Sequence, residues 1–312
     1  MAEADLPIKV LSLPPLFDSC YYFLMMIALL KTMRPKQWAK NSFIFTALVF
    51  DRKLLDLPAF LHTIAGAAIF SLVASAVYIF NDIADCESDQ QHPTKKLRPI
   101  ASGELPLRAA WAAGIILLLI SLPLAYLLSP EFLIICVVYF GLNLLYSAKL
   151  KHIPLIDVLV LASFYLLRVV AGTALIEVKQ FSPWLYIVTS LFALFIGFGK
   201  RRAELLLKQE NAGNIRPVLD GYTIELLDQL IIIVSGTTII AYSLYTFSAP
   251  NLPGNHTMML SIPFVLYGIF RYLFLIQTGE GGAPEDIALT DRPLQTAILL
   301  WSIVILLVFY FY

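Results

Sequence analysis

Long apolar stretches recur along the whole chain and constrain its fold more than any other feature. Hydrophobic residues make up 59% of the 312 residues and charged residues only 14%, whereas soluble domains average about 25% charged residues. A soluble chain of this length could not bury so much apolar surface, so we expect a protein that crosses a membrane many times. The net charge is zero, which gives no reason to expect a nucleic-acid partner.

Nine hydrophobic spans are predicted, all of them helical. Their apolar runs are continuous, unlike those of barrel strands, and only helices or closed barrels satisfy the backbone in lipid. We expect an all-α polytopic membrane protein, whose helices surround a central cavity open to the cytoplasmic side. Residues 1–20 are expected to be a tail, residues 21–30 an interfacial lead-in to the first span, and 21–312 a single transmembrane domain. The spans are residues 37–50, 58–80, 107–128, 131–147, 154–175, 183–199, 223–246, 259–277 and 293–311.

Lysine and arginine residues are unevenly shared between the two sides of these spans. Most lie before span one or in the loops after spans two, four, six and eight, whereas the opposite loops carry Arg52, Lys53 and Lys179. Positively charged loops remain in the cytoplasm. We therefore expect a multi-pass protein of the cell (inner) membrane, with the N-terminus and the polar clusters on the cytoplasmic side.

The segment NDIADCESD, directly after the second span, carries the most informative side chains. If the helix continues through it, Asn81, Asp85 and Asp89 are spaced i, i+4, i+8 and drift only about 40° per step, so they share one face. A row of hard oxygen ligands near the membrane surface suits Mg²⁺ shared with a substrate phosphate. Lys95 and Arg98 follow, which favours a metal–diphosphate site over an ordinary solvated helix end.

Other cations lie near the same predicted membrane face or inside a span. Arg168 falls within span five, where an ionisable residue is by default a functional candidate. It lies about 16 Å along the helix from Asp157, too far for a direct pair, and an ion pair with another acid is the alternative. Gly172 nearby permits close approach of a bulky group. The run Lys200–Arg202 directly follows span six and suits either phosphate or lipid head groups.

The sequence argues against a histidine or cysteine metal site, a disulfide-stabilised fold and a transporter. The four histidines and three cysteines are dispersed and show no histidine or zinc metal site and no disulfide framework. A transporter that uses its acids as a cation pathway would place them at mid-membrane depth and on both faces. Nearly all of the acids fall instead at the predicted cytoplasmic ends of the spans.

Over nearly its whole length the chain resembles the UbiA superfamily of intramembrane prenyltransferases. NDIADCESD fits the first Asp-rich motif of that superfamily, NDxxDxxxD. The second Asp-rich motif of prenyl-diphosphate users is missing, because the loop after span six reads GKRRAELLLKQENAGNIRPVLDGY. The chain resembles one branch in particular, the decaprenyl-phosphate phosphoribosyltransferases, through six segments in order: RPKQWAKN, NDIADCESDQQHPTKKLRPIASGELP, YSAKLKHIPLIDV, LLRVVAG, GKRRAEL and EDIALTDR.

This resemblance implies a Mg²⁺-dependent pentosyltransferase. It would move 5-phosphoribosyl from 5-phosphoribosyl 1-diphosphate to a polyprenyl phosphate in the bilayer and release pyrophosphate, for cell-envelope arabinan precursors. The alternative is a polyprenyl-diphosphate:4-hydroxybenzoate prenyltransferase of quinone synthesis. Oligomeric state and polyprenyl length stay open. The implied metal ligands are Asn81, Asp85 and Asp89, the catalytic acids Asp82, Asp85 and Asp89, and the substrate-binding residues Lys36, Tyr78, Lys95, Arg98, Tyr146, Lys149, Lys151, Asp157, Arg168, Lys200, Arg201 and Arg202.

Overall fold

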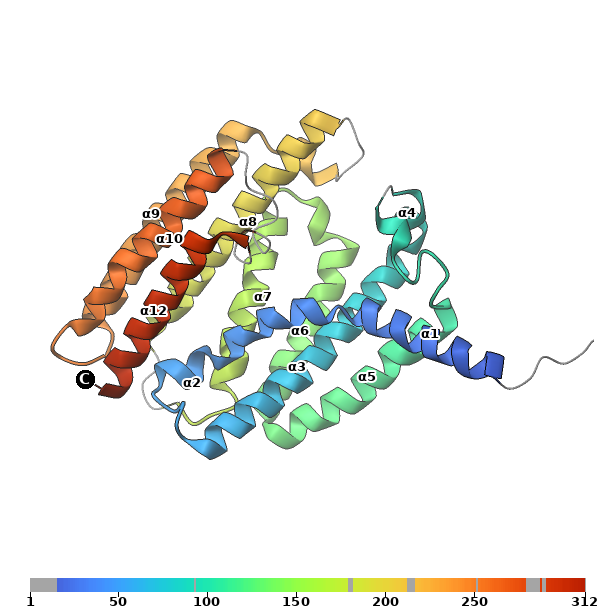
Figure 1. Cartoon of the computed structure of the whole chain (residues 1–312), viewed down its shortest axis with the longest axis horizontal. Helices are drawn as coiled ribbons and strands as arrows, with labels where there is room; N and C mark the ends of the chain where they lie inside the picture. Colours follow the sequence, from blue (N-terminus) through green and yellow to red (C-terminus); the bar gives the residue numbers. More distant parts are fainter. Residues whose placement is uncertain are drawn as a thin grey trace, which may run out of the picture. The chain divides into compact units, whose positions relative to one another are not determined.

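The structure, a computed structural model, is helical throughout the part of the chain that it describes (Figure 1). The described residues contain no β-strand, and eight of their helices are long and apolar enough to cross a membrane. The prediction of an all-α, multi-pass membrane protein is therefore confirmed. The described residues are 16–92, 94–178, 182–211, 217–250, 252–278, 287 and 290–311.

Local sequence signals account for several of the helix ends. Helix α6 (Pro130–Ala148) begins with a proline, and Ser129 Oγ accepts the N–H of Phe132 at 3.3 Å. Helix α9 (Ile224–Ser248) begins in the same way, with Thr223 Oγ1 accepting the N–H of Leu226 at 3.1 Å. The other elements are α1 (Leu16–Met33), α2 (Thr46–Phe50), α3 (Leu57–Ala84), α4 (Cys86–Gln91), α5 (Leu107–Leu128), α7 (Ile156–Thr173), α8 (Pro183–Asn211), α10 (Ile262–Gln277), α12 (Arg292–Phe311) and the 3₁₀ helices η1 (Pro35–Phe45), η2 (Lys95–Leu97), η3 (Leu150–His152), η4 (Pro217–Gly221) and η5 (Thr257–Ser261).

The chain divides into two compact units, and the first comprises Met1–Lys36 and Ala74–Leu118. Within it, the end of α3 packs against the start of α5, because the ring of Phe80 lies 5.3 Å from that of Trp111 between centroids. The end of α3 also contacts the end of α1, since Ser75 Oγ donates to the carbonyl of Met33 at 3.2 Å. These contacts bring α1 and α5 to the helix that leads into the Asp-rich segment.

The second unit comprises Gln37–Val73 and Leu119–Tyr312. Helix α7 packs against α6 and α8, α8 against α9, and α10 against both α9 and α12; Figure 1 shows α9, α10 and α12 side by side. Phe195 and Tyr272 meet edge to face, with centroids 5.0 Å apart, in a core that also buries Leu227. This bundle carries the second group of polar side chains described below.

The structure differs from the prediction of a first span at residues 37–50. That stretch is the 3₁₀ helix η1 followed by the five-residue α2, and the longer helix α1 precedes it. Pro35 has no N–H with which to continue α1, and Arg34 before it adopts a positive φ of 54°. Asn41 then turns inward, 2% exposed, and donates to Ser71 Oγ at 2.8 Å. These backbone and tertiary constraints give a short 3₁₀ segment where the hydrophobic pattern predicted a helix.

Several predictions remain predictions. The nine-span count and the central cavity are not decided by the eight helices found in the described residues. The single-domain boundary is also untested, although residues 16–20 of the predicted tail belong to α1. Lys179 and half of the segment EDIALTDR lie outside the described residues, as does part of the loop after α8.

Gly172 on α7 marks a close approach between two backbones of the second unit. A Cβ atom at this position would clash with the carbonyl oxygen of Ile44 in η1. Space for a bulky group was expected here. What approaches instead is the chain's own backbone, which fixes η1 against α7.

Gly172→Ala should destabilise the protein because the added methyl group would meet backbone rather than a flexible side chain. We expect a loss of about 1–3 kcal/mol in the free energy of unfolding, measured as a lower thermal midpoint of the purified protein in detergent. Gly236→Ala in α9 is the matched control, since nothing lies within 4 Å of its Cβ position and alanine favours a helix. Equal midpoints for the two variants would contradict this packing.

Candidate functional site

The Asp-rich segment lies in the first unit, where α3 ends and α4 begins. The helix is interrupted at Asp85, which has φ −91° and ψ 3°. Backbone bonding nevertheless continues across the break, because the N–H of Asp85 donates to the carbonyl of Asn81 at 2.9 Å and the N–H of Asp89 to that of Asp85 at 2.8 Å. The turn-by-turn spacing expected for Asn81, Asp85 and Asp89 is kept, with a break at its middle residue.

Two acids of this segment are buried in ion pairs with arginines. Asp82 is 3% exposed and Asp89 is 2% exposed. Arg98 Nη1 donates to Asp82 Oδ1 at 3.1 Å and to Asp89 Oδ2 at 2.6 Å. Arg34 Nη2 donates to the same Asp82 oxygen at 2.5 Å, and its guanidinium lies 5.0 Å from the centre of the Tyr78 ring. Pairing with cations is what makes burial of these carboxylates tolerable.

The donor set suits a hard divalent cation that brings further oxygen ligands with it. Two carboxylate oxygens, one from Asp82 and one from Asp89, converge on a single nitrogen of Arg98. Mg²⁺ is commonly held by one or two carboxylates, with water and substrate phosphates completing its coordination. The described residues contain no ready-made group of three or more His, Cys, Asp or Glu side chains placed to hold a metal. The segment therefore fits a metal that arrives with a phosphate.

The cations predicted beside the Asp-rich segment also belong to the first unit. Lys95 begins η2, and its N–H donates to His92 Nδ1 at 3.3 Å. Partial burial, followed by the positive charge of Lys95, lowers the pKa of His92, so the imidazole is neutral near pH 7. Positive charge around the acids therefore comes from lysine and arginine, including Lys36, two residues after Arg34.

The second unit holds a separate buried network around Asp157, in the first turn of α7. Asp157 is fully buried; its Oδ2 accepts from Arg201 Nε and its Oδ1 from the hydroxyl of Tyr222, both at 2.6 Å. Arg201 Nη1 donates to Glu204 at 2.6 Å, whereas its Nη2 is buried without a hydrogen-bond partner among the described residues. Asp157 and Glu204 therefore fix Arg201 in place, while its Nη2 makes no hydrogen bond to the described residues.

Tyr222 connects that network to Leu155, a residue with a positive φ just before α7. Its hydroxyl accepts the N–H of Leu155 at 2.6 Å, and Leu155 has φ 68° and ψ −46°, a sparsely populated conformation that costs about 1–3 kcal/mol. Burial and the hydrogen bond donated to Asp157 raise the pKa of Tyr222, so its hydroxyl keeps its proton. Tyr222 thus holds both the acid and the strained turn in place.

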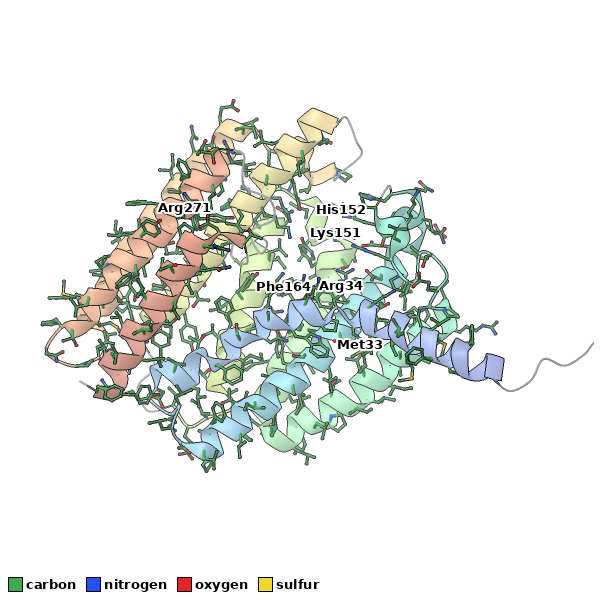
Figure 2. The ribbon with its side chains drawn as sticks, in the orientation of Figure 1. Met33, Arg34, Lys151, His152, Phe164 and Arg271 are labelled. Atoms are coloured by element: carbon green, nitrogen blue, oxygen red, sulfur yellow. The ribbon has the colours of Figure 1, made fainter. Side chains whose placement is uncertain are left out.

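Arg168 is held by neutral groups of the second unit rather than by Asp157. It donates through Nε to Asn41 Oδ1 at 2.8 Å, through Nη1 to the carbonyl of Phe164 at 2.7 Å, and through Nη2 to the Tyr139 hydroxyl at 3.1 Å. Phe164 is labelled in Figure 2. The separation from Asp157 expected from the helical rise is therefore observed. Arg168 ties α7 to both η1 and α6.

The remaining predicted binding residues divide into two groups within the second unit. Arg202 donates to Asp228 at 2.6 Å and to the carbonyl of Ile276 at 2.9 Å, so it joins α8 to α9 and α10. The other group lies in the last turn of α6, just after α6, or at the end of the apolar part of α8, and Lys151 of this group is labelled in Figure 2. It consists of Tyr146, Lys149, Lys151 and Lys200.

Sequence reasoning missed two residues that organise these clusters. Arg34 was counted only among the positive charges near the first span, and Tyr222 only as the end of a loop. The one available signal for Arg34 was the following proline, which ends the preceding helix. Nothing in the local pattern indicated that Tyr222 meets Asp157.

Tyr222→Phe should lower stability because it removes a donor from Asp157 and an acceptor from the N–H of Leu155. Leaving buried polar groups unpaired costs about 1–3 kcal/mol, which a lower thermal unfolding midpoint in detergent would report. Tyr126→Phe serves as the control, because Tyr126 is 58% exposed. A midpoint for Tyr222→Phe equal to that of the control would rule out this role.

Comparison with known proteins identifies the family. The model of the UbiA prenyltransferase family matches residues 41–303. The decaprenyl-phosphate phosphoribosyltransferase of Mycobacterium tuberculosis is 35% identical over 275 residues, which cover 87% of this chain and 90% of that protein. Its namesake from Corynebacterium glutamicum is 32% identical over 294 residues, covering 90% and 86%.

A solved structure shows the same fold. The UbiA homolog from Archaeoglobus fulgidus bound to GPP and Mg²⁺ aligns with a TM-score of 0.68 at 19% identity, covering 89% of this chain and 96% of the other. The resemblance expected from the Asp-rich segment is thereby confirmed. The chain belongs to the UbiA prenyltransferase family.

Proposed function

We propose that this protein transfers 5-phosphoribosyl from 5-phosphoribosyl 1-diphosphate to a polyprenyl phosphate in the membrane and releases pyrophosphate. One observation carries the proposal: identities of 32–35% over most of the chain to decaprenyl-phosphate phosphoribosyltransferases. The run Lys200–Arg202 in α8 supports it, because it offers cations in the part of the chain where a second Asp-rich motif would serve a prenyl diphosphate.

The Asp-rich segment would hold the diphosphate of the donor through Mg²⁺. The chemistry of its donor set supports this role, since Asn81, Asp82, Asp85 and Asp89 offer hard oxygen atoms at the end of one apolar helix. Mg²⁺ bound there supplies positive charge that stabilises the departing pyrophosphate. Structures of a UbiA homolog from Archaeoglobus fulgidus bound to Mg²⁺ or Cd²⁺ support the choice of a divalent ion.

The transfer itself needs little acid–base chemistry from the protein. The bond between ribose C1 and the diphosphate oxygen breaks, C1 gains oxocarbenium character, and an oxygen of the acceptor phosphate forms the new bond. That phosphate is already anionic, so no strong general base is required. The role of the protein is to neutralise and orient phosphates, for which Lys36 and Lys95 are candidates beside the Asp-rich segment.

A second set of cations is proposed for the remaining phosphate, either the acceptor phosphate or the 5-phosphate of the donor. Arg201 is the best candidate, because one of its buried donor nitrogens has no hydrogen-bond partner in the described part of the chain. Tyr146, Lys149, Lys151 and Lys200 are further candidates. By contrast, Arg168 and Arg202 are committed to helix contacts, which supports a structural contribution from both.

We also propose that the phosphate-binding residues face the cytoplasm at the inner membrane. The excess of lysine and arginine in the loops on that side supports this orientation. A water-soluble phosphoribosyl donor would then meet a lipid acceptor at the membrane surface.

The proposal is tested by giving the purified protein two substrate pairs, with and without Mg²⁺. We expect pyrophosphate release from 5-phosphoribosyl 1-diphosphate plus decaprenyl phosphate, and none from a polyprenyl diphosphate plus 4-hydroxybenzoate. Activity with the second pair alone would overturn the proposal in favour of aromatic prenyl transfer.

Asp85→Asn should reduce this transfer by about 100-fold or more, because it removes charge from the group that holds the diphosphate. Asp56→Asn is the matched control, since Asp56 is an exposed acid that precedes α3 at its other end. Product is measured with radiolabelled donor, and thermal midpoints verify that both variants fold. Near-normal transfer by Asp85→Asn would exclude Asp85 from the donor site.

A further inference from the structure

Arg98 lies where the two buried acids of the Asp-rich segment converge. Its Nη1 atom alone contacts both acids, Asp82 at 3.1 Å and Asp89 at 2.6 Å. A position between two carboxylate oxygens is a position for a cation, and here a guanidinium nitrogen fills it. Arg34 contacts only Asp82, so the two arginines are not equivalent.

The arginines also lie on the accessible side of the cluster. The side chains of Asp82 and Asp89 are each 3% exposed, whereas that of Arg98 is 28% exposed and that of Arg34 is 31% exposed. A cation that approaches from solvent therefore meets guanidinium groups before it reaches a carboxylate. It can bind the acids only if an arginine moves away.

Arg98 and a metal ion cannot occupy the position between Asp82 and Asp89 at the same time. Two like charges cannot share one position between the same pair of oxygen atoms. The acids, once buried, cannot be left unpaired either, because an uncompensated buried charge is strongly unfavourable. A guanidinium released from the carboxylates does have an alternative partner, since it binds phosphate oxygens in the same bidentate geometry.

We propose that Arg98 acts as an internal cation that occupies the metal position between Asp82 and Asp89. When the donor binds, Arg98 leaves this position and pairs with the diphosphate of the donor. In the free protein its guanidinium pairs with both acids, and Arg34 supplies the second positive charge. When a divalent ion arrives together with a diphosphate, the ion takes the carboxylates and Arg98 turns to the phosphate oxygens. The phosphate part of this exchange rests on the proposed function, whereas the competition between Arg98 and a metal does not.

Arg34 has a ring contact and pairs with only one of the two acids, so it serves as an internal comparison for Arg98. Its backbone is in the left-handed region before a proline, and its guanidinium lies over the Tyr78 ring. Losing Arg34 leaves Asp82 still paired with Arg98. Losing Arg98 leaves Asp89 without an ion-pair partner among the described residues and removes one of the two arginines paired with Asp82. The exchange therefore predicts a larger effect on metal binding from Arg98 than from Arg34.

The experiment is a titration of the full-length protein in lipid nanodiscs with Mn²⁺, followed by the electron paramagnetic resonance signal of free Mn²⁺. It is run without acceptor lipid, and with or without 5-phosphoribosyl 1-diphosphate. For the unaltered protein we expect weak binding of Mn²⁺ alone and an affinity about tenfold or more higher with the donor, within the usual range of coupling between two ligands.

Arg98→Gln should bind Mn²⁺ alone about tenfold more tightly than the unaltered protein and lose most of the donor dependence. Arg34→Gln should show a smaller gain. Arg271→Gln, which breaks a pair with Asp291 elsewhere in the chain, should leave Mn²⁺ binding unchanged. A purely structural role for Arg98 predicts the opposite sign, since a disturbed site would bind the metal less well.

Each outcome of these titrations supports or overturns the exchange between Arg98 and the metal. Unchanged or weaker binding of Mn²⁺ alone by folded Arg98→Gln overturns the exchange. If Arg98→Gln does not fold, Arg98→Lys replaces it: the lysine side chain is shorter and holds its ammonium less close to both acids, so metal binding should tighten partly, and no change overturns the proposal. If Mn²⁺ alone behaves as expected but the donor has no effect on any variant, the competition stands and the proposed donor fails.

Discussion

The structure of the first unit depends on neutralising two carboxylates at the end of an apolar helix. Asp82 and Asp89 follow directly from the hydrophobic part of α3 and are buried, where an isolated charge is unfavourable. Arg34 comes from the segment before α3 and Arg98 from the segment after α4, and both pair with these acids. The need for paired charge thus fixes how the chain enters and leaves the Asp-rich segment.

Two arginines of the second unit stabilise contacts between helices, whereas a third is a candidate for binding a ligand. Arg168 and Arg202 direct their donors to carbonyl, amide, hydroxyl or carboxylate groups that join neighbouring helices. Arg201 donates to Asp157 and Glu204, yet its buried Nη2 has no partner among the residues that the structure describes. A site for a phosphate needs such a preorganised donor, and a positive residue in the sequence does not by itself supply one.

Periodicity and charge in the sequence predicted the features that local geometry determines. Contacts between segments far apart in the chain could not be predicted in this way. Apolar runs predicted the long helices, and the helical rise predicted that Arg168 and Asp157 stay apart, because both follow from local geometry. The 3₁₀ helix η1 could not be predicted, since it depends on the inward hydrogen bonds of Asn41 and on the backbone contact at Gly172. The pairing of Arg34 with the Asp-rich segment is likewise a tertiary contact between residues 48 positions apart.

The central claim is that a divalent ion on the Asp-rich segment carries the diphosphate of the donor. It is tested most directly by electron–nuclear double resonance of Mn²⁺ bound to the protein together with 5-phosphoribosyl 1-diphosphate. We predict a ³¹P coupling typical of directly coordinated phosphate, which is lost in Asp82→Asn while a folded protein is retained. Bound Mn²⁺ without a ³¹P coupling, or a coupling unaffected by Asp82→Asn, would contradict the claim.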